Sequence, residues 1–468
     1  MFGQRLERTL NWVAAVGLLA GLGSAVSAAE RFELKEPPDK LRTFKVTTGL
    51  DVTGNLHAPP DPKKPLPLKV EAHFDFEERR LAGTGRDAQS LRALRNYDEA
   101  SATIHAGDQE SSQLLRNTLS LVVATGKGDG IDLFSPSGPM TYGELELLRT
   151  PGDPLAMLGL LPDGEVEVGE SWQPADWVLP LLTGVEAAEK STLTCKLESA
   201  DKARAKVSLG GEITGVILGA PAHVKLSGSY AYDFLQQAIS QIEVTQTEKR
   251  SMGAVAPGLD VTAKIAVNRT VVEKPRKLTD KLVAAVPVEA NDANRLLMFE
   301  APAWNVRFFH DRVWHMFHQN TEVAILRMLD AGRPIAQCNI KKLPDASPGE
   351  HVPEEQFRSD VQKTLGQNFQ EFIQSEKIKV RDELFVYRVI AVGTVDRRNE
   401  KGEAVVAPMQ WIYYLVANAD GRQLAFVFTV DPTLAEDLKN RDLSIVGGLE
   451  FLKPKATPIR ATPVRRKE

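Results

Sequence analysis

The stretch RTFKVTTGLDVTGNL, residues 42–56, alternates apolar and polar side chains along its whole length. Such a period of two is typical of a strand with one buried face and one solvated face. The same alternation occurs in LKVEAHFDFEERRL, residues 68–81, and in residues 98–106, 118–125, 203–216, 223–234, 239–249 and 260–273. The first half of the chain is therefore predicted to form an antiparallel sheet.

Several of these segments are longer than most strands of globular proteins, which usually have about three to ten residues. Long strands twist, so we expect a curved sheet whose concave face must be covered. The segments TYGELELLRTPGDPLAMLGLLP, residues 141–162, and ADWVLPLLTG, residues 175–184, combine helix formers with prolines. They are predicted to form a helical cover for a β domain that spans residues 30–273.

The second half of the chain has a different pattern. Residues 274–295 are rich in charge, alanine and proline and are predicted to be a linker. A helix near residues 354–376 is predicted from an apolar stripe at Phe357, Val361, Leu365, Phe369 and Phe372. Strands are predicted at residues 322–330, 333–343, 383–395, 408–418, 422–430 and 444–452, with a second helix at residues 432–440. Residues 296–452 should thus form an antiparallel sheet with two packing helices, and the whole chain belongs to a β-rich α+β class.

The two ends of the chain have distinct compositions. In residues 1–29, Arg5 and Arg8 precede an apolar run from Trp12 to Val26, which predicts a secretory signal peptide. The run is shorter than the roughly 20 residues that span a bilayer, so no integral membrane segment is expected after cleavage. Residues 453–468 are basic and proline-rich, which predicts a disordered tail. The alternative for this tail is weak electrostatic contact with an anionic surface.

The net charge and the absence of common catalytic motifs argue against several classes of function. A net charge of −5 over 468 residues creates no strong field, so nucleic acid is not expected as a partner. The sequence contains no P-loop, no G-x-G-x-x-G after a strand and no H-E-x-x-H. In GESWQ, Ser171 lacks the second glycine of a nucleophile elbow. These observations favour a non-enzymatic protein without a cofactor, although catalytic groups can also come from distant positions.

Two cysteines occur in the chain, Cys195 and Cys338. Each falls on the apolar face of its own predicted strand, in STLTCKLES and PIAQCNI respectively. The interpretation that this placement favours is two separately buried thiols, with a disulfide as the alternative.

The stretch FFHDRVWHMFHQN, residues 308–320, places histidines among large apolar side chains. A hairpin that turns at Asp311 and Arg312 would bring His310 and His315 to one face as diagonal neighbours. With a carboxylate, these two rings could bind a transition metal. The alternative, which the apolar surroundings favour, is that the rings pack in a core and hydrogen-bond to backbone or water.

Three aromatic residues of one predicted strand, Trp411, Tyr413 and Tyr414, allow two interpretations. The first is that they line the core of the second domain. The second is that they form a surface for a ligand or a protein partner.

Two parts of the sequence resemble known families. Val168, Gly169, Glu170 and Trp172 form a V-G-E-x-W pattern before a β-meander, which resembles a family of uncharacterised exported bacterial proteins. The segments GRQLAFVFTVDP, residues 421–432, and DLSIVGGLEF, residues 442–451, are similar in order and type to the PsbP-like fold over residues 296–452. The first resemblance implies an extracytoplasmic β-rich domain, and the second implies a binding or assembly role rather than catalysis.

Three functional hypotheses follow. The protein is expected to be a periplasmic or extracellular scaffold of the bacterial cell envelope that docks an unknown protein partner through its second domain. Alternatively, the concave sheet carries an apolar ligand such as a lipid, which requires apolar side chains beyond those that the helices cover. A metal-dependent enzyme that uses His310 and His315 is the third hypothesis, and it requires a carboxylate beside them in an open cleft.

Overall fold

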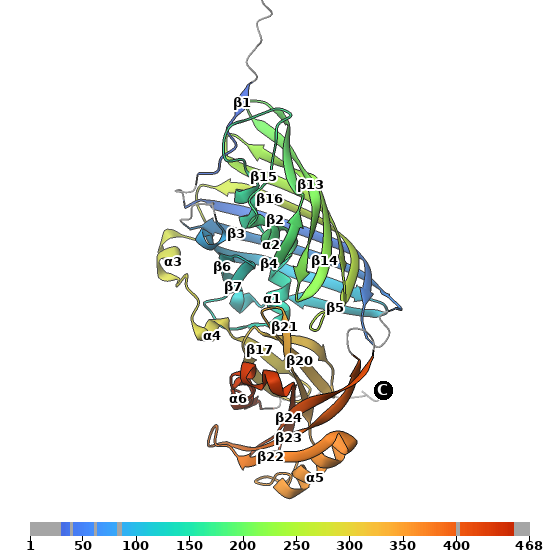
Figure 1. The fold of residues 1–468 in the computed structure, drawn as a ribbon. Helices are drawn as coiled ribbons and strands as arrows, with labels where there is room; N and C mark the ends of the chain where they lie inside the picture. Colours follow the sequence, from blue (N-terminus) through green and yellow to red (C-terminus); the bar gives the residue numbers. More distant parts are fainter. Residues whose placement is uncertain (1–29, 38–40, 60–62, 82–86, 399–402, 454–468) are drawn as a thin grey trace, which may run out of the picture.

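Two large antiparallel sheets dominate the computed structural model, which describes residues 30–37, 41–59, 63–81, 87–398 and 403–453 (Figure 1). Short α-helices and 3-10 turns account for the other regular elements. The predicted β-rich α+β class with a curved first sheet is thereby confirmed. The signal peptide predicted at residues 1–29 and residues 454–468 of the predicted basic tail lie outside the described residues.

The first sheet has thirteen strands, all paired antiparallel. Most neighbours are consecutive in sequence, but β2 pairs with β16 and so joins the start of the domain to its end. In spatial order the strands are β10 (Ser171–Trp172), β12 (Thr194–Ala200), β13 (Arg204–Ile217), β14 (Ala220–Asp233), β15 (Ala238–Arg250), β16 (Gly258–Val272), β2 (Thr43–His57), β3 (Leu66–Arg80), β4 (Arg92–Ala106), β6 (Leu121–Lys127) and β7 (Gly130–Phe134), with β11 (Ala187–Ser191) on β13 and β5 (Gln109–Leu114) on β4. A separate pair, β1 (Arg31–Phe32) and β9 (Val166–Glu167), lies beside this sheet.

The concave face of this sheet carries the larger hydrophobic core, because side chains alternate between the two faces of each strand. On β2, Phe44 and Val46 are fully buried, whereas Lys45 and Thr47 between and beyond them are partly exposed. Leucines of α1 (Tyr142–Leu148), η3 (Pro154–Leu160) and α2 (Val178–Thr183) pack into the same core. Figure 1 shows α1 and α2 beside the strands of this sheet. Short helical elements thus pack over part of the concave face.

Helix α1 is fixed in place at its first turn. Thr141 Oγ1 accepts the backbone N–H of Glu144 at 3.2 Å, and the Glu144 carboxylate accepts the backbone N–H of Thr141 at 2.8 Å. This capping box satisfies two N–H groups that the helix itself cannot. Arg116, which follows β5, donates to Glu144 at 2.7 Å. These contacts hold α1 beside β5, and its last residues therefore lie over the concave face.

A buried charge network attaches the helical cover to the sheet. Arg95 on β4 donates to both oxygens of Asp153 at 2.7 and 2.8 Å and to Glu78 on β3 at 2.9 Å. Asp153 also caps η3 by accepting the N–H of Leu155 at 2.9 Å. None of the three charged side chains is more than 4% exposed. Such buried charges are tolerated because each has an opposite charge within hydrogen-bonding distance.

The second large sheet has seven strands and lies below the first sheet in the view of Figure 1. In spatial order they are β19 (Trp314–Gln319), β20 (Val323–Asp330), β21 (Arg333–Lys342), β25 (Gln423–Val430), β24 (Ala404–Asn418), β23 (Leu384–Arg398) and β22 (Phe369–Lys377). A small sheet of β26 (Glu450–Phe451), β18 (Val306–His310), β17 (Leu297–Ala301) and β8 (Met140–Thr141) joins the two halves, because β8 of the first half pairs in parallel with β17.

The segment that was predicted to be a linker, residues 274–295, contains α3 (Asp280–Ala285) and α4 (Asp292–Arg295). Leu278 within it is fully buried, and its carbonyl oxygen accepts a hydrogen bond from Arg79 at 2.8 Å. This segment thus packs against the first sheet over part of its length.

The predicted helix at residues 354–376 is wrong in its second half. Helix α5 (Glu354–Leu365) ends before Gly366, which has a φ of +53°, and residues Phe369–Lys377 form β22 instead. Two register shifts in β22 allow Phe369 and Phe372, three residues apart, to pack against the same cluster as α5. Such bulges imitate the spacing of a helix, which explains the error.

Two elements were predicted after Val430, and the second is wrong in type over part of its length. The helix predicted at residues 432–440 is the 3-10 helix η5 (Pro432–Leu438). The first four residues of the expected strand at residues 444–452 belong to helix α6 (Arg441–Gly447), and only Glu450 and Phe451 form a strand, β26. Ile445, Val446 and Leu449 are buried, and this spacing fits one side of a helical turn as well as a short strand.

Both cysteines are free and buried, Cys195 on β12 and Cys338 on β21. The prediction of two separate thiols is confirmed. No helix in the described part of the chain is both long enough and apolar enough to cross a membrane.

Candidate functional site

An apolar groove with a volume of about 580 Å³ lies on the concave face of the first sheet, where the helical cover ends. Helix α1 forms its opposite wall with Tyr142 and Leu147. The sheet contributes Leu259, Val261 and Ala263 from β16, Leu50, Val52 and Leu56 from β2, Leu68, Val70 and Ala72 from β3, and Ala102 and Ile104 from β4. We call this set of residues the apolar groove.

The strand register makes these side chains one continuous surface. Ala263 is paired with Val52, Val52 with Val70, and Val70 with Ile104. Adjacent strands lie about 4.8 Å apart, so this row of four apolar residues extends roughly 14 Å across the sheet. A surface of this kind offers contacts to an elongated apolar ligand.

Burial decreases along the inner face of β2 while its apolar character persists. Phe44 and Val46 are fully buried and Leu50 is 7% exposed, but Val52 and Leu56 on the same face are partly exposed. Helical elements cover the first part of the face and leave the second part accessible. Apolar side chains that remain accessible in a concave surface are typical of a ligand site.

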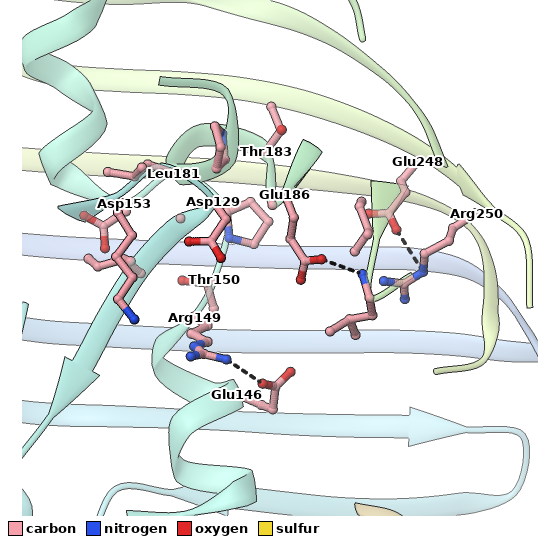
Figure 2. A pocket seen from close by; sticks show the side chains of 18 of the residues that line it. Asp129, Glu146, Arg149, Thr150, Asp153, Leu181, Thr183, Glu186, Glu248 and Arg250 are labelled. Carbon is pink, nitrogen blue, oxygen red and sulfur yellow. Dashed lines mark hydrogen bonds and ion pairs between the residues drawn. The ribbon is translucent and has the colours of Figure 1, made fainter. Parts of the chain in front are cut away.

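A second cavity, of about 330 Å³, adjoins the groove and is lined by charged residues (Figure 2). Glu146, Arg149, Glu248 and Arg250 line both cavities, and Glu186 lines the second cavity. We call these five residues the polar end. The groove and the polar end together present an apolar wall that terminates in charged groups.

The charged groups of the polar end come from three parts of the chain. Glu146 and Arg149, at the end of α1, form an ion pair at 3.8 Å. Glu248 and Arg250, on the inner face of β15, form another at 3.4 Å. Glu186 follows α2, and its Oε2 accepts the backbone N–H of Leu218 at 3.1 Å. Figure 2 shows the two ion pairs and Glu186 around one space.

The carboxyl groups of the polar end are short of positive charge. Burial raises the pKa of Glu146, Glu186 and Glu248 above the usual value, and the neighbouring arginines offset this only in part. The three carboxylates differ in exposure: the Glu248 side chain is 12% exposed, the Glu146 side chain is 39% exposed and Glu186 is exposed. A partly desolvated carboxylate gains free energy when a further positive charge approaches. Perturbed carboxyls beside a cavity are therefore a property expected of a binding site.

Gln246 on β15 adds an unpaired hydrogen-bond acceptor to the groove lining. The side chain is 2% exposed, and its Nε2 donates to the Thr183 carbonyl oxygen at 3.1 Å. Because that carbonyl can only accept, the amide orientation is fixed. Gln246 Oε1 is buried and has no donor among the described residues. An unsatisfied buried acceptor of this kind is costly unless a ligand supplies the donor.

The two histidines proposed as metal ligands lie in different sheets. The predicted hairpin that turns at Asp311 and Arg312 is wrong, because β18, which ends at His310, pairs with β17 and β26, whereas β19, which contains His315, pairs with β20. The main chain between them crosses from the small sheet to the seven-stranded sheet.

Each of these histidines already has a polar neighbour. His310 Nδ1 lies 2.8 Å from the Asp311 carbonyl oxygen, and His315 Nδ1 lies 3.4 Å from the Tyr142 hydroxyl oxygen. Burial lowers the pKa of both rings, that of His315 to about 4. The described residues contain no group of three or more histidine, cysteine or acidic side chains that could hold a metal ion. This geometry fits the interpretation in which both rings pack in a core. The contact of His315 with Tyr142 also joins the two halves of the chain.

Trp411, Tyr413 and Tyr414 are buried in the second half of the chain, with exposed fractions of 6%, 7% and 0%. Trp411 and Tyr413 pack with α5, whereas Tyr414 lies on the other face and donates to Asp442 at 2.6 Å. In this arrangement they contribute to two cores rather than to an open surface.

The polar end was not identified from the sequence, because its members are far apart in the chain. One pattern pointed to it: along the inner face of β15, Ile242 and Val244 are followed by Gln246, Glu248 and Arg250. An inner face that changes from apolar to charged within one strand departs from a simple core pattern.

The comparisons with known proteins give no family. No family model matches, and no curated protein matches. A lipovitellin structure concerned with lipid–protein interactions shares 9% identity at a TM-score of 0.30, over 52% of this chain and 26% of that chain. The outer membrane protein OprD from Pseudomonas aeruginosa shares 9% identity at a TM-score of 0.11, over 86% of this chain and 95% of that chain. This chain spans about a quarter of the lipovitellin chain, and both scores are too low to bear on fold or function.

Proposed function

We propose that this protein binds the hydrocarbon chain of an amphiphile, such as a lipid, in the apolar groove and acts as a non-enzymatic binding protein. The observation that carries the proposal is the apolar inner face of β2, β3, β4 and β16, which continues past the helical cover. The proposed location is the periplasm or the extracellular space of a bacterium, because residues 1–29 have the pattern of a secretory signal peptide. Hydrocarbon chains dissolve poorly there, so a carrier has a physical role.

The size of the expected affinity follows from the hydrophobic effect. Removing one methylene from water contributes about 0.8 kcal/mol, so ten buried methylenes would contribute roughly 8 kcal/mol. Association itself costs about 4 kcal/mol or more, so ten buried methylenes alone are expected to give a dissociation constant of about millimolar. Binding of this strength is reversible, as a carrier requires.

A charge introduced into the groove tests the proposal. In the Val52→Glu variant a carboxylate would lie in the row formed by Ala263, Val70 and Ile104. We expect the dissociation constant of dodecyl maltoside, measured by displacement of the uncharged probe N-phenyl-1-naphthylamine, to rise by about tenfold or more, because the carboxylate must be desolvated when the chain binds.

The matched control is Thr53→Glu, one residue further along β2 on the exposed opposite face. This variant adds the same charge to the same strand and should change the dissociation constant by less than about twofold. Thermal unfolding of both variants checks that the fold is retained. Unchanged binding in a folded Val52→Glu protein would contradict the proposal.

The scaffold hypothesis and the PsbP-like resemblance of residues 296–452 remain predictions. The resemblance is supported by a seven-stranded sheet with α5 packed on one face and α6 on the other. Docking of a protein partner through this part would be detected as a stable complex that forms equally well with wild-type protein and with the Val52→Glu variant.

A further inference from the structure

We infer that the polar end selects amphiphiles whose head group carries a positive charge and N–H donors, as a primary ammonium does. This inference rests on the proposed binding of a hydrocarbon chain in the apolar groove. It concerns the other end of the same ligand, which the charged cavity next to the groove would receive.

The first argument is the balance of charge around the cavity. Glu146, Glu186 and Glu248 lie around one cavity with Arg149 and Arg250, and both arginines are already paired with glutamates. No ion pair to Glu186 is formed within 4.0 Å by the described residues; its Oε2 accepts only the Leu218 N–H. Opposite charges attract strongly in a partly desolvated space, so a cationic head group is favoured there and an anionic one is disfavoured.

The neighbouring cation does not remove this excess of negative charge. Lys127 also lines the cavity, and the Asp132 carboxylate that it contacts at 3.3 Å is shared with Arg312 and Arg295. Asp129 lines the same cavity, so that its carboxylate and those of the three glutamates outnumber the lining cations Lys127, Arg149 and Arg250. The ligand is therefore the natural source of the missing positive charge.

The second argument is independent of charge and comes from Gln246. This side chain is 2% exposed, lines the groove and has a buried Oε1 without a donor among the described residues. Two positions further along β15, Glu248 Oε1 is buried and has no hydrogen bond of acceptable geometry, although Arg250 Nε lies 3.4 Å away. Both atoms are acceptors, and an ammonium group offers three donors. Burial raises the pKa of Glu146, Glu186 and Glu248, and the nearby arginines offset this only in part.

Three ligands with the same twelve-carbon chain test the inference on the full mature chain. Dodecylamine carries a cation, dodecanoate an anion and dodecyl maltoside no charge, and each is titrated below its micellar concentration against bound N-phenyl-1-naphthylamine. We expect dodecylamine to bind about tenfold more tightly than dodecanoate, with dodecyl maltoside between them.

The Glu186→Gln variant locates the selectivity. Glutamine retains an oxygen for the Leu218 N–H, so the variant removes a charge without removing that hydrogen bond. The preference for dodecylamine over dodecanoate should fall to about threefold or less. Asp260→Asn is the matched control, because it removes the same charge from the exposed outer face of β16 next to the groove and should leave the preference intact.

The outcomes separate this inference from the proposed function. Failure of all three ligands to displace the probe would overturn both. Equal binding of the three ligands, or tighter binding of dodecanoate, would overturn the selectivity and leave the groove proposal standing. An equal loss of preference in Glu186→Gln and Asp260→Asn would assign the effect to overall charge and overturn the role of the polar end.

Discussion

Replacement of Arg95 by methionine should destabilise the fold far more than replacement of an exposed arginine. Arg95 donates three hydrogen bonds to carboxylates, two to Asp153 and one to Glu78, and it is 2% exposed. Burial alone would lower the pKa of Arg95, but the charges of Asp153 and Glu78 raise it well above the usual value. The guanidinium is therefore stabilised in its charged form by these partners.

The magnitude follows from what remains after the substitution. Asp153 and Glu78 would stay buried, and removal of one partner from a buried ion pair costs about 3–5 kcal/mol. Asp153 would retain the Leu155 N–H and Glu78 would retain Arg80 at 3.4 Å, which places the expected loss near the lower end of that range. Arg31→Met is the control. Arg31 forms an exposed ion pair with Glu167 at 3.0 Å, and loss of such a pair should lower the free energy of unfolding by less than about 1 kcal/mol.

Urea unfolding at neutral pH measures both losses as changes in the free energy of unfolding. A second variant identifies the cause: Arg95→Met combined with Asp153→Asn should regain part of the stability, since the substitution of Asp153 removes one of the unpaired charges. The reasoning would be refuted by an Arg95→Met loss no larger than that of Arg31→Met. It would also be refuted by a double variant that is less stable than Arg95→Met alone.

Further predictions concern titration, backbone conformation and thiol reactivity. The pKa of His315 is lowered to about 4 by burial, so between pH 7 and pH 5 only the unfolded chain takes up a proton there. Stability should fall by up to about 2 kcal/mol over this interval, and His315→Gln should flatten the fall in urea titrations at the two pH values. Gly366→Ala should cost about 1 kcal/mol or more because the φ of +53° disfavours a side chain, whereas Gly128→Ala, in equally open space at an ordinary φ, should cost less; thermal unfolding compares them. Cys195 and Cys338 are buried, and burial raises the pKa of Cys195 to about 12, so Ellman's reagent should detect two thiols in denaturant and none in the native protein.

The strands of the first sheet were predictable because their alternation directly reflects which face is buried. The helix predicted at residues 354–376 failed where β-bulges gave Phe369 and Phe372 a helical spacing. The hairpin predicted to turn at Asp311 and Arg312 failed because β18 pairs with β17 and β26 instead of with β19. Local patterns report burial but not the identity of the partner, and the errors have this common origin.

The polar end illustrates the same limit. Glu146, Glu186 and Glu248 come from the end of α1, the segment after α2 and the inner face of β15. Only the curvature of the sheet brings these three elements around one cavity. A sequence pattern can mark Glu248 as a charge on an otherwise apolar face, but it cannot supply the other two.

The lengths of the elements explain why a groove exists at all. Strands β2, β3, β4 and β16 have 15 residues each, which corresponds to roughly 50 Å at 3.3 Å per residue. Helix α1 and turn η3 have seven residues each and are only about 10 and 14 Å long. Short covering elements cannot span such strands, so part of the inner face has to remain accessible.

Element length does not explain why the accessible part is apolar. Polar side chains could replace those of Val52, Leu56, Val70 and Ile104 while most of the buried core stays intact. These positions are only partly buried and line the accessible groove. Accessible apolar surface lowers solubility and favours self-association, so its presence needs a compensating role. The proposed binding of a hydrocarbon chain would supply that role, and a ligand with a polar head group would also account for the charged residues at the point where the apolar surface ends.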